Sequence, residues 1–268
     1  MKSKDYYKSK FFLGALIIII ILGTDILLHK GMVRVLLPVT FMKSQAPVDL
    51  LHCKQSLVIH SKDWAKAIDS VKAIEALSAT TDGFEVDIYF DSAINSFYVY
   101  HDSSGMSTVK IEQILDIYKS RNLSASVWFD FKNLNSTNHD KALAAFITMR
   151  KKYNLGNKMI IESSNIKYLP AYCDSGFFTS YYTPFFNPYL LKENKLKKIT
   201  DSISNNLKQY PVSALSGYYF QYPFLKRYFP NYPILTWANR SKFSIVSFIF
   251  NHSLMEDEHL KIILYTKN

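Results

Sequence analysis

Residues 83–90 have the sequence Gly-Phe-Glu-Val-Asp-Ile-Tyr-Phe, and residues 127–132 have the sequence Val-Trp-Phe-Asp-Phe-Lys. Side chains alternate across a β-strand, so Glu85 shares one face with Asp87, and Asp130 shares one face with Lys132. The opposite face of each segment carries only apolar side chains. This pattern predicts two strands with an apolar outer face and a charged inner face.

The three acidic residues on these inner faces are Glu85, Asp87 and Asp130. Carboxylates that converge in a protein interior repel one another and lose hydration, at a cost of several kcal/mol each, unless a partner compensates them. A metal ion is the simplest compensation, so we expect these three residues to be metal ligands. Structural ion pairs with Lys132 and other bases are the alternative.

Strand and helix signals alternate along the rest of the chain. The predicted strands are 56–61, 83–91 with a hairpin return at 97–101, 125–134, 158–163, 177–183, 214–220, 233–238 and 260–265. Eight strands, nearly all followed by helical segments, predict an α/β fold, a (β/α)8 TIM-type barrel rather than a doubly wound sheet. The last predicted strand lies at the end of the sequence, so we expect a barrel that lacks its last helix.

The first residues differ in character from the remainder. Residues 1–10 are rich in lysine and predict a basic cytoplasmic tail, and the uncharged apolar run that follows predicts a transmembrane anchor at 11–28. Residues 29–53 are interpreted as a linker and 54–268 as the barrel domain. A cleaved signal peptide is the alternative, but no convincing cleavage site follows the apolar run. We therefore expect a single-pass protein of the cell membrane, with its barrel in the periplasm or extracellular space.

Composition limits the partners and the redox chemistry. The net charge of +10 favours anionic partners such as phosphate esters or lipid headgroups, whereas the scattered lysines argue against nucleic acid. Only Cys53 and Cys173 are present, which excludes a disulfide-built scaffold and argues against a cysteine-rich metal site. A single bridge and two buried thiols are both compatible with the sequence.

Reactive groups of such barrels lie at the C-terminal ends of the strands. His60 ends the first predicted strand, His101 ends the hairpin return, and Trp237 closes the seventh predicted strand. We expect all three to face the same mouth as the carboxylates. Four further residues could line the pocket because of strand alternation: Glu162, Tyr181, Tyr218 and Asn239.

These residues carry a family resemblance. The stretch from Phe84 to His101 resembles the second-strand hairpin of the sphingomyelinase D (venom phospholipase D) branch of the glycerophosphodiester phosphodiesterase-like superfamily of TIM barrels, also described as phospholipase C-like phosphodiesterases. Residues 128–132 are similar to its third-strand motif, and residues 235–237 to its seventh-strand tryptophan. His60 falls where the family has its first histidine. Asp130 stands where ordinary glycerophosphodiesterases usually have Glu, which favours the venom-like branch.

The resemblance implies a chemistry for the site. Glu85, Asp87 and Asp130 would hold Mg²⁺, or Ca²⁺ or another divalent cation, and His60 and His101 would be the acid/base pair. Lys132 would take part in catalysis and substrate binding as a second positive contact for the phosphate. The expected function is therefore a metal-dependent phosphodiesterase, a hydrolase or lyase acting on a glycerol- or lipid-type phosphodiester, with Trp237 contacting the substrate.

Two alternatives remain at this stage. The chain after His60 lacks the Arg-Gly of ordinary glycerophosphodiesterases, which is compatible with a catalytically degenerate barrel that serves as an anchored binding or scaffold domain. A glycosidase is the other alternative, with two of the carboxylates acting as acid and nucleophile. That alternative leaves Lys132 and both histidines without a role.

Overall fold

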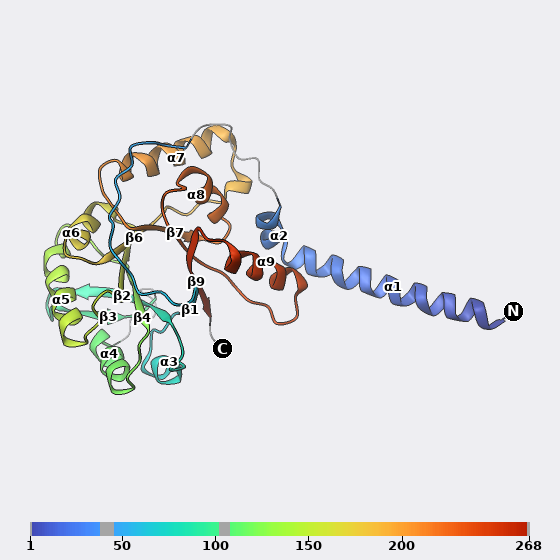
Figure 1. The fold of residues 1–268 in the computed structure, drawn as a ribbon, viewed down its shortest axis with the longest axis horizontal. Coiled ribbons are helices and arrows are strands. Elements are labelled where there is room, and N and C mark those ends of the chain that lie inside the picture. Colours follow the sequence, from blue (N-terminus) through green and yellow to red (C-terminus); the bar gives the residue numbers. More distant parts are fainter. Residues whose placement is uncertain (1, 38–45, 102–107, 267–268) are drawn as a thin grey trace.

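The computed structural model describes residues 2–37, 46–101 and 108–266, and for 2–10 only the backbone. Its centre is a closed barrel of parallel strands, as predicted, and its N-terminal helix projects away from the barrel (Figure 1). The barrel strands are β1 (Asp63–Lys66), β2 (Gly83–Asp91), β4 (Ser126–Phe131), β5 (Met159–Ser163), β6 (Phe178–Tyr182), β7 (Ala214–Tyr218), β8 (Ile234–Trp237) and β9 (Leu260–Thr266). Pairing of β1 with both β9 and β2 closes the barrel, and β3 (Ser96–Val99) forms an antiparallel hairpin with β2.

Helical segments connect successive strands and pack on the outside of the barrel. They are α3 (Val71–Ala76), α4 (Ile111–Ser120), α5 (His139–Lys152), η2 (Ile166–Tyr168) with α6 (Leu169–Asp174), η3 (Pro188–Leu190) with α7 (Glu193–Leu207), α8 (Tyr222–Tyr228) and α9 (Ile245–Glu256). Within the described residues no helix follows β9. Apolar side chains between strands and helices form the larger core cluster, which includes the predicted outer-face residues Phe84, Val86 and Phe129.

The barrel interior is apolar at one end and polar at the other. Its apolar cluster contains Trp64, Trp128 and Leu235, with Leu57 packed against it. The Trp64 ring lies so close to Gly83 that a Cβ there would be 2.1 Å from it, so this position accepts only glycine. Two residues further along the strands, the inward-facing positions become charged, which places the polar groups at the C-terminal mouth.

The predicted first strand is wrong. Residues 56–61 do not form a strand but cross the N-terminal end of the barrel, where Val58 hydrogen-bonds Asn157 and Ser126. Their apolar alternation reflects Leu57 and Ile59 packing against the barrel interior rather than strand pairing. The first strand is instead β1, which begins at Asp63.

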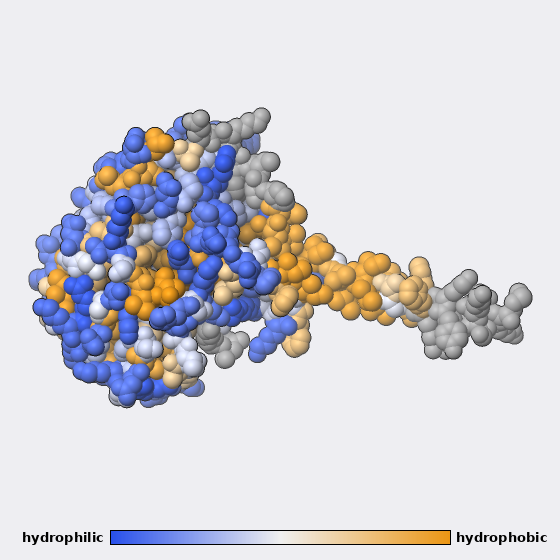
Figure 2. Space-filling view, in the orientation of Figure 1, coloured by the Kyte–Doolittle hydropathy of each residue, from blue (hydrophilic) through white to orange (hydrophobic). Residues whose placement is uncertain are grey.

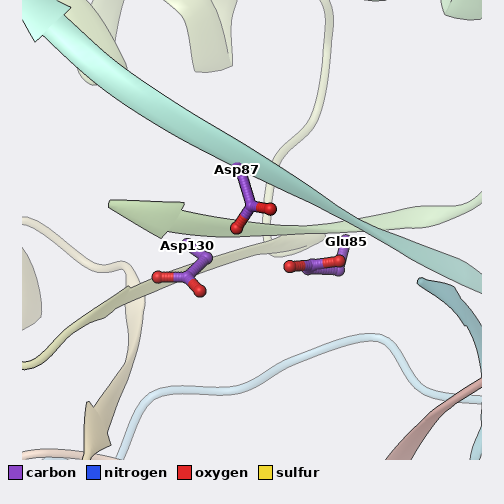
Figure 3. Close-up of side chains that lie close together, drawn as sticks. All are labelled: Glu85, Asp87 and Asp130. Carbon is purple, nitrogen blue, oxygen red and sulfur yellow. The ribbon is translucent and has the colours of Figure 1, made fainter. Parts of the chain in front are cut away.

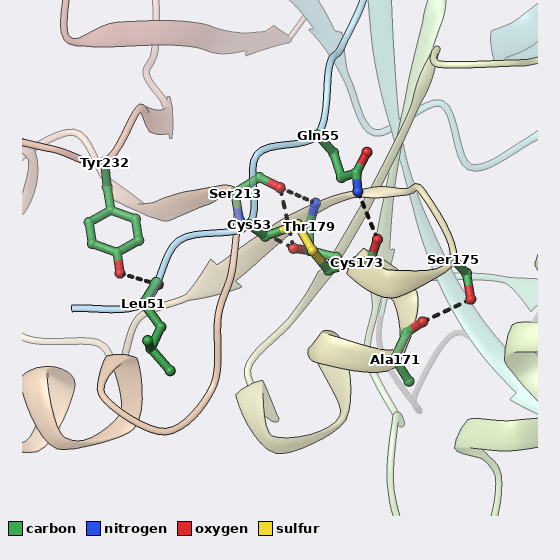
Figure 4. The surroundings of a disulfide bond; sticks show 9 residues. All are labelled: Leu51, Cys53, Gln55, Ala171, Cys173, Ser175, Thr179, Ser213 and Tyr232. Carbon is green, nitrogen blue, oxygen red and sulfur yellow. Dashed lines mark hydrogen bonds between the residues drawn. A yellow bond between two sulfur atoms is a disulfide. The ribbon is translucent and has the colours of Figure 1, made fainter. Parts of the chain in front are cut away.

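The segment before β1 is tied to the barrel by a disulfide bond between Cys53 and Cys173 of α6 (Figure 4). Gln55 Nε2 donates a hydrogen bond to the Cys173 carbonyl (3.0 Å), and Tyr232 donates one to the Leu51 carbonyl (2.7 Å). The sequence had left this pairing open. A structural disulfide is typical of proteins that fold in an oxidising compartment.

Removing this disulfide is expected to lower stability substantially. It links residues 120 positions apart, and closing a loop of about 100 residues stabilises a fold by about 4.7 kcal/mol through the entropy of the unfolded chain. We expect the free energy of unfolding of the double variant Cys53→Ser, Cys173→Ser to be about 4 kcal/mol lower than that of the unaltered chain. Chemical denaturation provides the measurement, and a decrease of less than 1 kcal/mol in the free energy of unfolding would contradict a disulfide link between the 46–62 segment and α6. As a control, adding reductant to the double variant should not lower its stability further.

The N-terminal helix α1 (Lys2–Leu28) contains an apolar span from Phe11 to Leu28 that is not buried against the barrel. Its length and composition suit a membrane span, and a signal sequence near the N-terminus has the same character. The short helix α2 (Lys30–Leu36) follows and packs its buried residue Met32 into the core. The apolar surface of α1 is visible as a continuous stalk in Figure 2.

Candidate active site at the barrel mouth

Three carboxylates from two neighbouring strands converge at the mouth. Glu85 and Asp87 come from β2 and Asp130 from β4, and the strand register places Asp87 directly beside Asp130. One oxygen from each residue lies within 4.8 Å of the others, and the three side chains point toward one another (Figure 3). We call these residues the carboxylate cluster. Glu85 and Asp87 are almost completely buried, while Asp130 retains slight exposure.

One lysine partly neutralises the cluster. Lys132 Nζ lies 2.6 Å from Asp87 Oδ1 and also contacts Asp130 Oδ2. Burial opposes the charge on this ammonium group, but the neighbouring Asp130 and Asp87 nevertheless raise the pKa of Lys132. A single positive charge is therefore shared between two carboxylates, and Glu85 has no part in this ion pair.

The remaining negative charge is poorly compensated. Burial, and then repulsion from Asp87 and Asp130, raises the pKa of Glu85 well above its usual value. Burial also raises the pKa of Asp130 to about 6, with Lys132 opposing and Asp87 adding to the shift. These directions indicate an interior that disfavours ionised carboxylates and would be relieved by a cation.

The cluster suits a hard divalent cation. All of its donors are carboxylate oxygens, which Mg²⁺ and Ca²⁺ prefer, at distances near 2.0–2.1 Å for Mg²⁺ and about 2.3–2.6 Å for Ca²⁺. Two ligands of one ion can be separated by at most twice that distance, and a separation within 4.8 Å is close to this range. Within the described part of the chain, Asp87 Oδ2 is buried and accepts no hydrogen bond, which leaves it available as a ligand.

Two residues of the β1–α3 loop hydrogen-bond Glu85 and Asp87, and the sequence pattern does not point to either of them. The Ala67 amide donates a hydrogen bond to Glu85 Oε2 (2.6 Å), and Asp69 Oδ1 accepts one from the Asp87 amide (2.9 Å). Burial and the nearby Asp87 raise the pKa of Asp69 to about 7. Recognising β1 at 63–66 would have placed this loop at the mouth.

The two predicted histidines lie in different places. His101 follows β3 and lines the cavity, with Nε2 4.0 Å from Asp87 Oδ2 and 68% of its side chain exposed. His60 is exposed and precedes β1, so it lies at the N-terminal end of the barrel, away from the carboxylate cluster. The expectation that His60 ends the first strand and belongs to the acid/base pair is therefore wrong, because the strand begins only after it.

Lys66 occupies the position that had been expected for a histidine. It is the last residue of β1, it lines the cavity, and its Nζ lies 5.6 Å from the centre of the Trp237 ring. The sequence pattern does not point to this residue, because the apolar alternation at 56–61 favours a first strand that ends before it. The mouth thus carries two lysines, Lys66 and Lys132, beside the carboxylates.

Aromatic residues form the opposite wall. Trp237 packs edge-on against Tyr182 and Tyr218, with ring centres 5.4 and 4.8 Å apart.

Glu162 also lines the cavity and accepts a hydrogen bond from Ser180 (2.8 Å). Burial and the charge of Asp130 raise the pKa of Glu162 to about 8, although hydrogen bonds from Ser216 and Ser180 oppose this shift. Glu162, Tyr218 and Trp237 therefore occupy the expected place.

The other two pocket candidates do not line this cavity. The hydroxyl of Tyr181 accepts a hydrogen bond from Asn206 of α7, on the outside of the barrel, and Asn239 lies in the exposed loop after β8. The cavity has a volume of about 80 Å³, the share of two to three water molecules in the liquid. It is lined by Lys66, Glu85, Asp87, His101, Trp128, Asp130, Lys132, Glu162, Tyr182, Tyr218, Trp237 and Leu264.

Comparisons with known proteins give matches at the level of structure only. No protein-family model and no curated protein matches the sequence. The fold is similar to a candidate glycerophosphoryl diester phosphodiesterase from Silicibacter pomeroyi DSS-3, with a TM-score of 0.52 and 10% identity, covering 82% of this chain and 91% of that one. It is also similar to a candidate glycerophosphodiester phosphodiesterase from Galdieria sulphuraria, with a TM-score of 0.50 and 10% identity over 79% and 95% of the two chains.

A third similar structure is a glycerophosphodiester phosphodiesterase from Parabacteroides distasonis ATCC 8503, at 16% identity and a TM-score of 0.49, covering 76% of this chain and 93% of that one. Identities this low show a common fold and nothing finer. This chain therefore shares the TIM-barrel fold of glycerophosphodiester phosphodiesterase structures, while the resemblance to the sphingomyelinase D branch stays a prediction from its motifs.

Proposed function

We propose that this protein is a membrane-anchored, metal-dependent phosphodiesterase that cleaves a glycerol- or lipid-type phosphodiester. The observation that carries the proposal is the convergence of Glu85, Asp87 and Asp130 with Lys132 and His101 at one barrel mouth. The fold shared with glycerophosphodiester phosphodiesterase structures supports the same reaction class. Anchoring rests on the apolar span of α1.

The carboxylate cluster would hold Mg²⁺ or another divalent cation, which when bound would polarise a phosphoryl oxygen and neutralise developing charge. Lys132 contacts the cluster and lines the same cavity, where its ammonium group can contact a second phosphate oxygen. Lys66, at the end of β1, also lines the cavity and adds a second positive charge beside the phosphoryl group. Together these groups orient the phosphorus centre and stabilise negative charge on it.

Proton transfer would fall to His101. Its imidazole can take a proton from an attacking hydroxyl or give one to the leaving oxygen. The attacking group is water, or a neighbouring hydroxyl of the substrate that yields a cyclic phosphate. Among the described residues, His101 is the one histidine that lines the cavity. The two-histidine mechanism expected from the sequence is therefore replaced here by a site with His101 and with Lys66 at the position expected for the other histidine.

A catalytically degenerate scaffold is the second candidate, favoured by Lys66 standing where the family resemblance implies a histidine. The glycosidase alternative has less support. The cluster oxygens lie within 4.8 Å of one another, whereas the two carboxyl groups of a retaining glycosidase are about 5–5.5 Å apart and those of an inverting one further still.

The two histidines provide a matched test. We expect His101→Ala to lower the turnover of a model phosphodiester by about 10²–10⁴-fold, because general acid/base catalysis contributes that much. His60→Ala, an exposed histidine at the other end of the barrel, should leave turnover unchanged, and chelator should abolish turnover in both the unaltered chain and this control. Equal loss in both variants would contradict the site, and no turnover by the unaltered chain on any diester would favour the scaffold.

A further inference from the structure

Helix α9 is apolar on two opposite sides. Val246, Phe250 and Leu254 face the core and are buried. Four other apolar residues at its start are exposed, and we call them the α9 patch: Phe243, Ile245, Phe248 and Ile249. Phe243 is fully exposed and Phe248 is 73% exposed. The second apolar side of such a helix is normally covered by protein or by lipid, and contiguous exposed apolar residues mark an interaction surface.

The α9 patch adjoins the end of the apolar span of α1. Asp25 Oδ2 accepts a hydrogen bond from the Val246 amide at the start of α9 (3.0 Å), and the Ser244 hydroxyl lies 3.3 Å from His29 Nδ1. Both helices meet at the base of the stalk (Figure 1), where the apolar surface of α1 continues onto the body of the protein (Figure 2). The patch is therefore continuous with the surface that would be embedded in lipid.

Exposed basic residues flank this junction. Lys30 and Arg34 follow α1, and Lys242 precedes the patch. An apolar face bordered by lysine and arginine is typical of a segment that lies in the membrane interface, where the charges meet anionic headgroups. The chemistry of the border fits a lipid surface better than it fits an apolar protein partner.

The patch lies on the same end of the barrel as the cavity. Residues 238–244 connect the C-terminal end of β8 to α9, and the C-terminal ends of the parallel strands form the mouth. A row of aromatic rings extends outward from the cavity wall: Trp237 contacts Tyr218, Tyr218 stacks on Phe220 at 5.2 Å, and exposed Phe185 packs edge-on against Tyr218 and Phe220.

The aromatic row also reaches the helices at the base of the stalk. Tyr219 contacts Phe250 of α9, with ring centres 5.2 Å apart. On its other side, α2 approaches so closely that a Cβ at Gly31 would lie 2.8 Å from the Tyr219 hydroxyl oxygen. An apolar route thus runs from the wall of the cavity to the foot of α1.

We propose that the α9 patch rests in the interface of the membrane that α1 spans, so that the mouth faces the bilayer and takes the phosphodiester headgroup of a membrane lipid. The substrate part of this inference rests on the proposed phosphodiesterase function. The headgroup enters the small polar cavity, and the apolar part of the lipid lies along the Trp237, Tyr218, Phe220 and Phe185 rings. A soluble diester would need neither the patch nor the aromatic route.

The docking surface can be tested without turnover. Because Cys53 and Cys173 are paired, a Phe248→Cys substitution adds one free thiol to the full chain for an environment-sensitive fluorophore. In phosphatidylcholine proteoliposomes we expect brominated acyl chains to quench this probe at least two-fold. A probe at Lys151→Cys, exposed on α5 away from the stalk, should not be quenched. Equal quenching of both probes by aqueous iodide would overturn the proposal that the α9 patch lies in the membrane interface.

The substrate class is tested by two reactions in the same vesicles. Phe248→Asp should lower the turnover of a vesicle glycerophospholipid at least ten-fold and leave that of soluble bis(4-nitrophenyl) phosphate within two-fold, whereas Leu51→Asp, at the N-terminal end of the barrel, should alter neither. Unchanged lipid turnover in Phe248→Asp, or an equal loss on both substrates, would overturn the lipid assignment. If the unaltered chain turns over neither substrate, the phosphodiesterase and its lipid substrate both fail, and the probe result alone decides the docking surface.

Discussion

Glu85→Gln is expected to abolish activity and at the same time stabilise the metal-free protein. The substitution removes a carboxyl group whose ionisation is opposed by burial and by repulsion from Asp87 and Asp130, yet an amide oxygen can still accept the hydrogen bond from Ala67. A gain on the order of 1 kcal/mol would raise Tm in the presence of chelator by about 2–4 °C. Turnover with Mg²⁺ should fall by about 10³-fold, because loss of a ligand removes several kcal/mol of charge stabilisation.

The pH dependence of this gain has a defined sign. The pKa of Glu85 is raised in the folded state, so its proton is bound more tightly there than in the unfolded chain. The stabilisation that this proton gives the folded state is complete below the pKa of Glu85 in the unfolded chain, near 4.5, and is lost as the pH rises through its pKa in the folded state. The stability difference between Glu85→Gln and the unaltered chain, both metal-free, should therefore be small near pH 4.5 and grow as pH increases.

Glu75→Gln is the matched control, since Glu75 is an exposed glutamate on α3. It should change Tm and turnover little, as surface substitutions usually fall within about 0.5 kcal/mol. Thermal unfolding of the full chain in detergent, with chelator and with Mg²⁺, provides the measurement. A metal-free protein that loses stability on Glu85→Gln would indicate that Glu85 is a structural partner rather than a ligand.

Lys132→Met is expected to act in the opposite direction on stability. Lys132 contacts both Asp87 and Asp130, and removing one partner of a buried ion pair costs about 3–5 kcal/mol because the other charge remains buried. In chelator, Tm should fall on the order of 10 °C. Mg²⁺ should restore part of this loss, because the cation replaces the missing positive charge, while turnover stays at least about 10²-fold below that of the unaltered chain.

The control for this variant is Lys72→Met, which removes an exposed lysine from α3. Differential scanning calorimetry with and without Mg²⁺ separates the two roles of Lys132. A fall of less than about 2 °C in chelator would mean that Asp87 and Asp130 are compensated by other groups. Full activity in Lys132→Met would show that the lysine does not contact the substrate.

The sequence was sufficient to predict the barrel and the three residues of the carboxylate cluster, because both follow from strand alternation. β2 and β4 place apolar residues outside and Glu85, Asp87 and Asp130 inside. Strict alternation of apolar and charged residues fits a strand and does not fit the 3.6-residue period of a helix. Glu162 and Tyr218 could be placed on the same basis. The first strand could not, since residues 63–66 are only four residues long and carry Asp and Lys at their ends, whereas the apolar alternation at 56–61 serves to close the other end of the barrel.

That one misplaced strand accounts for the error at His60 and for the missed Lys66. Shifting the first strand to residues 63–66 moves His60 to the far end and brings Lys66 to the mouth. Contacts such as that of Asp69 with the Asp87 amide depend on how a loop folds back, and no residue pattern predicts them. The disulfide likewise depends on where the 46–62 segment crosses the barrel, a path that only the folded structure defines.

The central claim is that Glu85, Asp87 and Asp130 hold one divalent cation. Anomalous diffraction from crystals grown with Mn²⁺ tests it most directly. We predict a single strong peak at the mouth, with an oxygen from each of the three residues within about 2.0–2.3 Å of it, in the range of hard-cation ligation. A map with no peak there, and with Lys132 still bridging Asp87 and Asp130, would contradict the account.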